Sequence, residues 1–149
     1  MSADFADRFG LGPIDQISYV VDNIDHSLPG FEALFGAFDV SQNALPDCTI
    51  RGKQADCTLK MAIGHSGAME IELIEVVEGE TTHSEHLRDH GEGLHHVRFR
   101  VDDIDAKLPE LEAEGFEVLL YKRFSPQIAF AYLETPKTVG GSVIELLQM

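Results

Sequence analysis

The spacing of apolar residues changes from one stretch of the chain to the next, and each change marks an expected element. Residues 14–21 are rich in β-branched and aromatic side chains without helical periodicity, which predicts a strand. Apolar residues then recur every three to four positions over residues 25–36, which predicts a helix capped by Asn23 or Asp22 and stopped by Gly36. Three further strands are expected in the first half of the chain, near residues 49–51, 57–63 and 68–75.

The second half of the chain follows the same order. A short helix over residues 84–90 should stop at Gly91, and a strand over 95–101 then leads into a helix over 104–114. Residues 1–12, at the other end of the chain, are predicted to form a loose arm. Three strands close the chain, near residues 116–122, 127–133 and 142–148.

An internal repeat underlies this order. Residues 16–25 and 96–105 share a pattern at a constant offset of 80 positions, and residues 71–74 and 144–147 match at an offset of 73. Two copies of a βαβββ unit predict an α+β fold. No linker or low-complexity tract separates the copies, so we expect one packed domain over residues 1–149, built from modules at 14–76 and 84–149.

The bulk composition is typical of a soluble globular protein. Apolar residues make up 44% and charged residues 25% of the 149 positions, which is enough for a sizeable core. Lys and Arg number 11 against 26 Asp and Glu, and the resulting net charge of −15 disfavours binding to nucleic acid or to anionic membranes. Small anionic molecules are not excluded by this total, because the basic residues could form local patches.

The sequence carries no strong signal for export, membrane insertion or disulfide bonding. No apolar run reaches the roughly 18 residues that span a membrane, and residues 1–8 are acidic without an apolar signal region. Cys48 and Cys57 are too few for a disulfide framework and lack the spacing of a zinc motif. We therefore expect a soluble cytoplasmic protein.

Two glutamates stand inside apolar strands at equivalent positions of the repeat. Glu72 lies within Ile-Glu-Leu-Ile and Glu145 within Ile-Glu-Leu-Leu, where a carboxylate is costly unless it is paired, neutralised or bound to a cation. A solvent-facing strand surface would explain one such glutamate equally well, but two equivalent ones are less easily a coincidence. Gln16 and His96 form a second equivalent pair, each near the start of its strand. One imidazole, two carboxylates and one amide oxygen converging in a cleft would suit Zn, Co, Ni, Mn or Fe(II).

The other histidines are weaker candidates. His95 should point to the opposite face of its strand from His96, because successive strand residues alternate. His83 and His86 could lie one helical turn apart, but the pattern of their helix indicates an exposed one. A lone histidine in an apolar stretch is more often a core residue than a ligand, so His96 is favoured mainly by its equivalence to Gln16.

Two longer motifs extend this picture. The first runs from Ser84 to His96 with the sequence SEHLRDHGEGLHH, and the second runs from Ala129 to Leu146. Both resemble the vicinal-oxygen-chelate superfamily of glyoxalase I, methylmalonyl-CoA epimerase, extradiol dioxygenases and bleomycin-resistance proteins, and they are closest to the epimerase-like branch. This resemblance implies paired βαβββ modules that form an open, cup-shaped mixed sheet around one divalent metal ion, usually in a homodimer.

The resemblance also implies roles for individual residues. His96 and Glu145 match ligand positions of the second module, and Glu72 falls where the family has Glu or Gln. Gln16 resembles the glutamine of zinc-type glyoxalase I, which completes a four-ligand metal set. Glu145, and secondarily Glu72, would also shuttle the substrate proton. Lys53 departs from the pattern, because the epimerase branch carries a catalytic glutamate there.

The sequence thus predicts a metal-dependent enzyme that abstracts a proton next to a carbonyl group, an isomerase or epimerase acting on methylmalonyl-CoA or another acyl thioester. A bound metal ion would polarise the substrate oxygen and stabilise the enolate. Two alternatives stay open: a glyoxalase I-like lyase on another carbonyl substrate, and a bleomycin-resistance-like protein that binds a small molecule without chemistry. We also expect a homodimer that packs through sheet edges near the first strands of the two halves.

Overall fold

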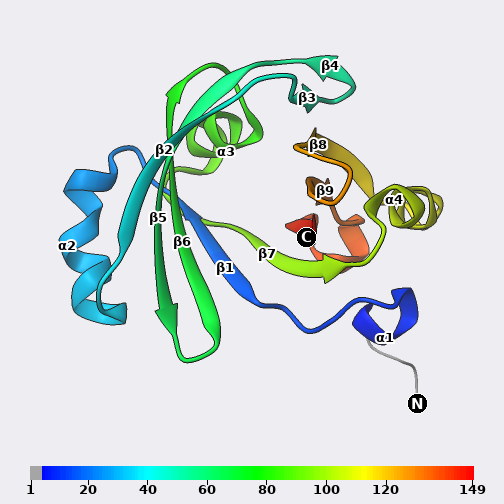
Figure 1. The fold of residues 1–149 in the computed structure, drawn as a ribbon, viewed down its shortest axis with the longest axis horizontal. Helices are drawn as coiled ribbons and strands as arrows, with labels where there is room; N and C mark the ends of the chain where they lie inside the picture. Colours follow the sequence, from blue (N-terminus) through cyan, green and yellow to red (C-terminus); the bar gives the residue numbers. More distant parts are fainter. Residues whose placement is uncertain (1–4) are drawn as a thin grey trace.

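The computed structural model describes residues 5–149 and places ten strands in one curled sheet (Figure 1). The sheet order is β2-β5-β6-β1-β7-β10-β9-β8-β3-β4. The strands are β1 Gln16–Val20, β2 Asp39–Leu45, β3 Thr49–Ile50, β4 Lys53–Gln54, β5 Cys57–Ser66, β6 Met69–Glu78, β7 Gly93–Val101, β8 Glu117–Arg123, β9 Ala129–Glu134 and β10 Val143–Gln148. The helices are α1 Phe5–Phe9, α2 Ile24–Phe35, α3 Thr82–His90 and α4 Ile104–Ala113, with a 3-10 turn η1 at Lys137–Val139.

The predicted α+β fold of two βαβββ units in an open, cup-shaped sheet is confirmed. Figure 1 shows α2 outside one wing of the sheet, α4 outside the other wing, and α3 between the wings. The repeat holds at single-residue precision, because α2 begins at Ile24 and α4 begins at Ile104, 80 positions later. Each helix is capped by the residue before it, since Asn23 and Asp103 accept backbone hydrogen bonds with their side chains.

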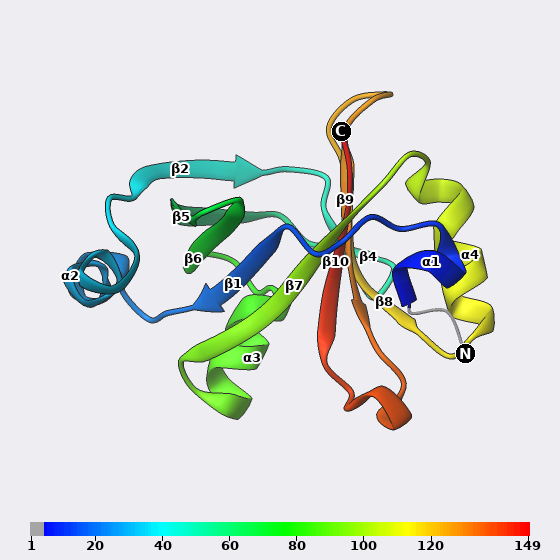
Figure 2. The same cartoon turned by 90° about the horizontal axis from the view of Figure 1, so that it is seen from below.

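The two halves are joined by antiparallel pairing of β1 with β7, which places Ile17 opposite Val97 (Figure 2). On its other side β1 pairs with β6, and β7 pairs with β10, both in parallel. Both edges of both first strands are therefore filled within one chain. The expectation that a homodimer forms through these edges is wrong for that reason, and dimerisation itself stays a prediction.

The first half departs from the prediction at its second strand. β2 spans 39–45 as an edge strand that pairs only with β5, and all but its last residue are exposed. Exposure on both faces removes the apolar alternation that would mark the strand in the sequence. The strand expected at 49–51 is instead the two-residue β3, which pairs with β8 of the other half.

The start of the chain is more regular than predicted. Residues 5–9 form the short helix α1 where the sequence suggests a loose arm, and the ring of Phe9 packs edge-on against Phe116 with centroids 6.4 Å apart. Residues 1–4 of the expected arm lie outside the described residues. No helix within residues 5–149 is long and apolar enough to cross a membrane.

Three clusters of buried apolar residues hold the sheet and helices together. One cluster packs α4 against β9 and β10, a second packs α2 against β5 and β6, and a third fills one end of the cup between the two halves. Both cysteines lie in this third cluster as buried free thiols. The polar centre described below is thus surrounded by packed apolar layers.

We expect Leu146→Ala to lower the free energy of unfolding by about 2–5 kcal/mol, because Leu146 is fully buried in the cluster beneath α4 and its removal leaves a cavity. Urea unfolding followed by circular dichroism measures this difference. Leu34→Ala is the matched control, since Leu34 is 73% exposed and should change stability by no more than about 0.5 kcal/mol. Equal losses in the two variants would contradict this account of the core.

Candidate functional site

The four residues that the repeat singles out lie on four adjacent strands at the centre of the sheet. Gln16 begins β1, Glu72 lies in β6, His96 in β7 and Glu145 in β10, and these strands are neighbours in the order β6-β1-β7-β10. None of the four is more than 8% exposed. The structure therefore brings the whole predicted set together inside the cup.

Strand register explains why the repeat makes these residues meet. Glu72 stands opposite Ser18 on β1, and Glu145 stands opposite Arg98 on β7. Ser18 and Arg98 are themselves 80 positions apart, so they are equivalent in the two halves. The carboxylate of each half therefore lies on the strand next to the central pair β1 and β7, at an equivalent register position.

The Nε2 atom of His96 is the middle of the cluster. It lies 2.9 Å from Glu145 Oε2, 3.1 Å from Gln16 Oε1 and 3.8 Å from Glu72 Oε1. The Ser18 hydroxyl donates to the same Glu72 oxygen at 2.8 Å and so fixes the direction of that carboxylate. One imidazole nitrogen thus faces donor atoms from all three other strands.

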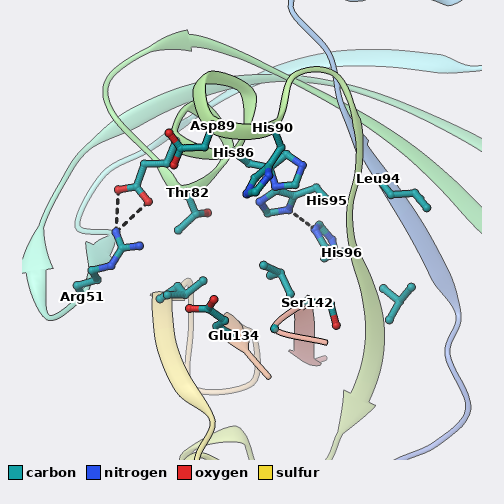
Figure 3. Close-up of a pocket in the computed structure, with 15 residues that line it drawn as sticks. Arg51, Thr82, His86, Asp89, His90, Leu94, His95, His96, Glu134 and Ser142 are labelled. Carbon is teal, nitrogen blue, oxygen red and sulfur yellow. Dashed lines mark hydrogen bonds and ion pairs between the residues drawn. The ribbon is translucent and has the colours of Figure 1, made fainter. Parts of the chain in front are cut away.

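His95 lies on the same side of β7 as His96, which corrects the prediction that it points away. The pairing of β7 with β1 skips His95, because Ser18 pairs with His96 while Tyr19 pairs with Leu94. His95 is the extra residue of a β-bulge, and a bulge interrupts the alternation of side chains along a strand. Its Nδ1 atom consequently lies 2.8 Å from Nδ1 of His96 (Figure 3).

This contact assigns the tautomer of His96. Burial lowers the pKa of His95 well below its usual value, so the His95 ring is neutral. The His95 ring also hydrogen-bonds to the backbone of Thr82, and because its Nδ1 already faces His96, we assign the donating proton to Nε2. His95 Nδ1 is then an acceptor, His96 Nδ1 carries the donated proton, and His96 Nε2 presents a lone pair to the centre.

The Gln16 carboxamide fits this centre in two orientations. With its oxygen inward, Oε1 lies 3.1 Å from His96 Nε2 and Nε2 donates to Glu70 at 3.3 Å. With the amide turned over, its nitrogen donates to His96 Nε2 at 3.1 Å and to Glu145 Oε2 at 3.2 Å, while its oxygen accepts from Arg98 at 2.9 Å. The second orientation gives the amide hydrogen-bond partners in the metal-free centre. In the first orientation, the atoms that face the centre from Gln16, Glu72, His96 and Glu145 are all acceptors.

An acceptor-only set is what a divalent cation requires. Ligand atoms about 2.1 Å from a common ion are roughly 3.0–3.4 Å from one another, so the contacts of His96 Nε2 with Glu145 and Gln16 have suitable lengths. Glu72 is the outlying donor at 3.8 Å. Within residues 5–149 no group of three His, Cys, Asp or Glu side chains already has the arrangement of a metal site. The donors fit a cation chemically, and Glu72 has to move closer to complete the set.

The electrostatics of the centre are set mainly by burial. Burial raises the pKa of Glu72 to about 7; the charge of His96 and the Ser18 hydrogen bond oppose this shift, while the charges of Glu145 and Glu70 add to it. Burial therefore favours the protonated form of Glu72 in the cation-free centre. A buried proton and a bound cation are two ways of neutralising the same group of carboxylates.

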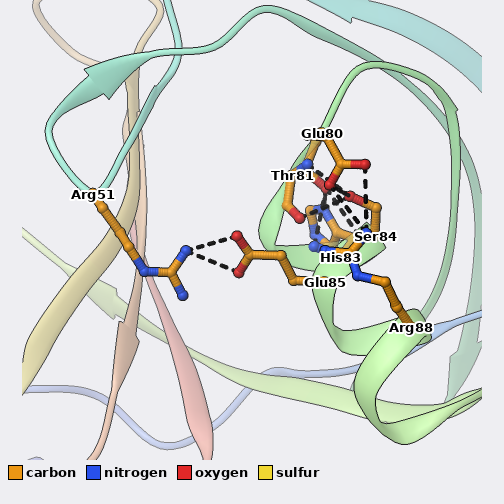
Figure 4. Close-up of polar contacts among 7 residues, drawn as sticks. All are labelled: Arg51, Glu80, Thr81, His83, Ser84, Glu85 and Arg88. Carbon is orange, nitrogen blue, oxygen red and sulfur yellow. Dashed lines mark hydrogen bonds and ion pairs between the residues drawn. The ribbon is translucent and has the colours of Figure 1, made fainter.

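An aromatic cluster behind His96 was not predicted. His83 is fully buried, although the sequence pattern suggests that its helix is exposed, and its Nε2 lies 3.0 Å from the Tyr132 hydroxyl. Its Nδ1 lies 3.1 Å from the Thr81 hydroxyl (Figure 4). Burial lowers the pKa of His83 to about 3, so this ring is neutral. The Tyr132 ring packs 4.7 Å from the His96 ring. The available sequence signal was the capping box between Thr81 and Ser84, which turns His83 inward at the start of α3.

A cavity of about 470 Å³ opens next to the centre, between α3 and the ends of β8, β9 and β10 (Figure 3). Its wall includes His95 and His96 but none of the other three donors. Val143 also lines the cavity and stands two residues before Glu145, on the same face of β10. Lys53, by contrast, is exposed on β4 and does not line the cavity, so it is not placed to act as a base there.

The fold and the central donor set together define a paired-module protein with a candidate metal centre between its halves. The chain belongs to the Glyoxalase/Bleomycin resistance protein/Dioxygenase superfamily, whose profile matches residues 15–132. This confirms the resemblance found in the sequence. No curated protein matches the chain.

Several solved structures share the fold. A hypothetical protein from Bacillus halodurans C-125 is 22% identical with a TM-score of 0.63, over 92% of this chain and 94% of that one. Methylmalonyl-CoA epimerase from Mycobacterium tuberculosis is 20% identical with a TM-score of 0.62, over 92% and 87% of the two chains. A substituted epimerase from Streptomyces coelicolor, in complex with 2-nitronate-propionyl-CoA, is 23% identical with a TM-score of 0.62, over 92% and 94%. At these identities the comparison establishes the shared fold.

We expect His96 to be the Nδ1–H tautomer in the metal-free protein, and we expect His95→Phe, which cannot accept a hydrogen bond, to abolish this preference. Long-range ¹H–¹⁵N correlation spectra of the imidazole nitrogens report the tautomer directly. Chelator competition should show Co²⁺ binding weakened by about 10- to 100-fold in His95→Phe, the scale for losing a partner that orients a ligand, and partly restored in His95→Gln.

His90→Phe is the control for this prediction, because His90 belongs to the same group of rings but contacts His86 rather than His96. It should leave both the tautomer and the Co²⁺ affinity unchanged. An Nε2–H tautomer of His96 in the wild-type protein would overturn the assignment, whatever the variants do.

Proposed function

We propose that this protein is a divalent-metal-dependent enzyme that removes a proton next to a carbonyl group and returns it, as an isomerase or epimerase does. The observation that carries the proposal is the position of His96 Nε2, 2.9 Å from Glu145 and 3.1 Å from Gln16 at a buried point where four strands meet. Buried carboxylates and an imidazole at such distances are retained for ion binding or chemistry more readily than for packing.

Gln16, Glu72, His96 and Glu145 would hold the cation. This set of one nitrogen and three oxygen ligands suits Zn, Co, Ni, Mn or Fe(II) and does not distinguish among them. When bound, the ion supplies Lewis acidity toward the carbonyl oxygen of the substrate. Ser18 and His95 would orient Glu72 and His96 through the hydrogen bonds described above.

Glu145 is our candidate for moving the proton. Its carboxylate shares a strand face with Val143, which lines the cavity beside His96. Glu145 itself does not line the cavity, so the α-carbon of a substrate would have to extend beyond the cavity wall toward it. The carboxylate would then take the α-proton, and the electron pair of the C–H bond would pass into the enolate. The same carboxyl group would return the proton to the opposite face once the enolate has turned over, which inverts the carbon centre. Glu72 is the second candidate, but the hydrogen bond from Ser18 holds it on the far side of His96 Nε2.

The substrate within this class is open. Methylmalonyl-CoA epimerases share the fold, which makes an acyl thioester one candidate, and a glyoxalase I-like lyase acting on another carbonyl compound would use the same four residues. One observation favours a binding protein without chemistry: Lys53, at the position where the epimerase branch has its second carboxylate, is exposed and lies outside the cavity. A glutamate there would not reach the cavity wall, so we do not expect Lys53→Glu to create epimerase activity.

Glu145→Gln separates the enzyme from the binding protein. The amide keeps an oxygen donor of similar size but is not a base, so we expect the metal to be partly retained while exchange of the substrate α-proton with deuterated solvent falls by about 100-fold or more. Elemental analysis after reconstitution and NMR-detected exchange over a panel of carbonyl compounds measure the two effects. His96→Ala should lose the metal ion.

Glu112→Gln is the matched control, because Glu112 is exposed on α4 far from the centre. It should retain both metal and exchange. Only trace metal in the reconstituted wild-type protein, unchanged in His96→Ala, would rule out the metal centre. A ligand that binds wild type and Glu145→Gln equally, with no exchange in either, would establish the binding protein instead.

A further inference from the structure

The cavity beside His96 has a composition of its own, separate from the metal-type donors. Only His96 belongs to both. The rest of its wall comes from α3, from Arg51 between β3 and β4, and from residues of β7, β8, β9 and the segment that enters β10 (Figure 3). α3 and Arg51 lie outside the four strands that carry the donors, and they bring three of the four permanently charged side chains to this wall.

The charges on the cavity wall do not suit an anion. Its only permanently positive side chain among the lining residues is Arg51, against Glu85, Asp89 and Glu134, so the permanent charges add up to 1 − 3 = −2. Arg51 already forms an ion pair, because one of its guanidinium nitrogens donates to both oxygens of Glu85 at 2.7 and 2.9 Å (Figure 4). Neither Asp89 nor Glu134 forms an ion pair with a lysine or arginine anywhere in residues 5–149.

The histidines of the wall carry no permanent charge. Burial and the neighbouring His90 lower the pKa of His86, which favours the neutral form of that ring. An anionic ligand group could approach only the remaining N–H groups of Arg51, where it would lie next to the Glu85 carboxylate and within a wall of net negative charge.

The wall does offer an unused hydrogen-bonding group. Thr82 is 4% exposed and lines the cavity, and its hydroxyl is the one buried side-chain oxygen or nitrogen without a partner in the described part of the chain. Figure 3 shows this side chain beside the histidine rings of the wall. A buried hydroxyl without a partner is unfavourable, so a ligand that pairs with it gains affinity.

We propose that this cavity takes an uncharged or cationic carbonyl compound that hydrogen-bonds to Thr82, and that it selects against polyanions such as coenzyme A thioesters. The inference rests on the proposed function for its carbonyl chemistry, but the charge selection follows from the cavity wall alone. A volume of about 470 Å³ holds a small molecule or an acyl group with a short arm. The phosphates of coenzyme A would have to lie at a mouth that carries uncompensated carboxylates.

Two probes with the same acyl group test the selection. Propionyl-CoA and the propionyl thioester of N-acetylcysteamine share the acyl thioester, but only propionyl-CoA carries the long arm with the nucleotide and its phosphates. Calorimetry with the metal-reconstituted protein at low salt compares their affinities, and a variant that removes acidic groups from the wall separates the effect of charge from that of size. We expect the uncharged thioester to bind at least 10-fold more tightly. The double variant Asp89→Asn, Glu134→Gln should strengthen propionyl-CoA binding by about 5- to 10-fold at low salt, less at high salt, and leave the uncharged thioester unchanged.

Thr82→Val tests the hydroxyl, because valine keeps the shape and removes only the oxygen. It should weaken the uncharged thioester by roughly 3- to 10-fold, whereas Thr138→Val, an exposed substitution in η1, should have no effect. If neither thioester binds, a thermal-shift screen of anionic, uncharged and cationic carbonyl compounds tests which charge class the cavity accepts. A set of hits that is anionic, or no uncharged or cationic hit at all, overturns the proposal.

The outcomes keep the two proposals apart. Tighter binding of propionyl-CoA, insensitive to the acidic substitutions, would overturn the charge selection, and deuterium exchange of that thioester would still support the proposed function. Binding of the uncharged thioester without any exchange would uphold the cavity assignment and overturn the enzymatic role.

Discussion

The antiparallel pairing of β1 with β7 is the constraint on which the rest of the structure depends. It sets Ile17 opposite Val97 and so joins the two halves across an approximate twofold relation. Each half alone supplies one carboxylate and one further polar group, which would face the open side of a four- or five-stranded sheet. Because the central pairing holds the halves in register, these polar groups meet in one buried place. Neither half could form the centre by itself.

Each of the many buried polar groups needs a hydrogen-bond or ion-pair partner. Arg98 shows how this is done, since it is buried in β7 and donates to Asp15 at 2.8 Å and to Glu70 at 2.6 Å. Burial by itself lowers the pKa of Arg98, but the hydrogen bond that Arg98 donates to Asp15 and the charges of Glu145 and Glu70 raise it overall, so the guanidinium keeps its charge. This fixed cation balances part of the negative charge and offers Gln16 a donor in its turned orientation. The network supplies the buried polar groups of the centre with hydrogen-bond partners.

The donors and the cavity share the central strands. The donors lie on β1, β6, β7 and β10, and the superfamily shares the fold that carries these strands. The cavity wall combines residues of β7, β8, β9 and β10 with α3 and with Arg51 of the β3–β4 hairpin, which crosses from the first half to pair with β8. The repeated strands are constrained by their mutual register, whereas α3 and the crossing hairpin supply three of the four permanently charged residues of the wall.

The sequence by itself determined the repeated order of strands and helices and the four residues that meet in the centre. It also predicted the first residue of each repeated helix to within one position. It could do so because strand and helix periodicities are local, and because equivalent positions such as Glu72 and Glu145 are visible as a constant offset. Only the tertiary structure decided that β2 forms an exposed edge and that His95 turns toward His96. A bulge and an edge depend on which strand lies alongside and in what register, and that neighbour is distant in the chain.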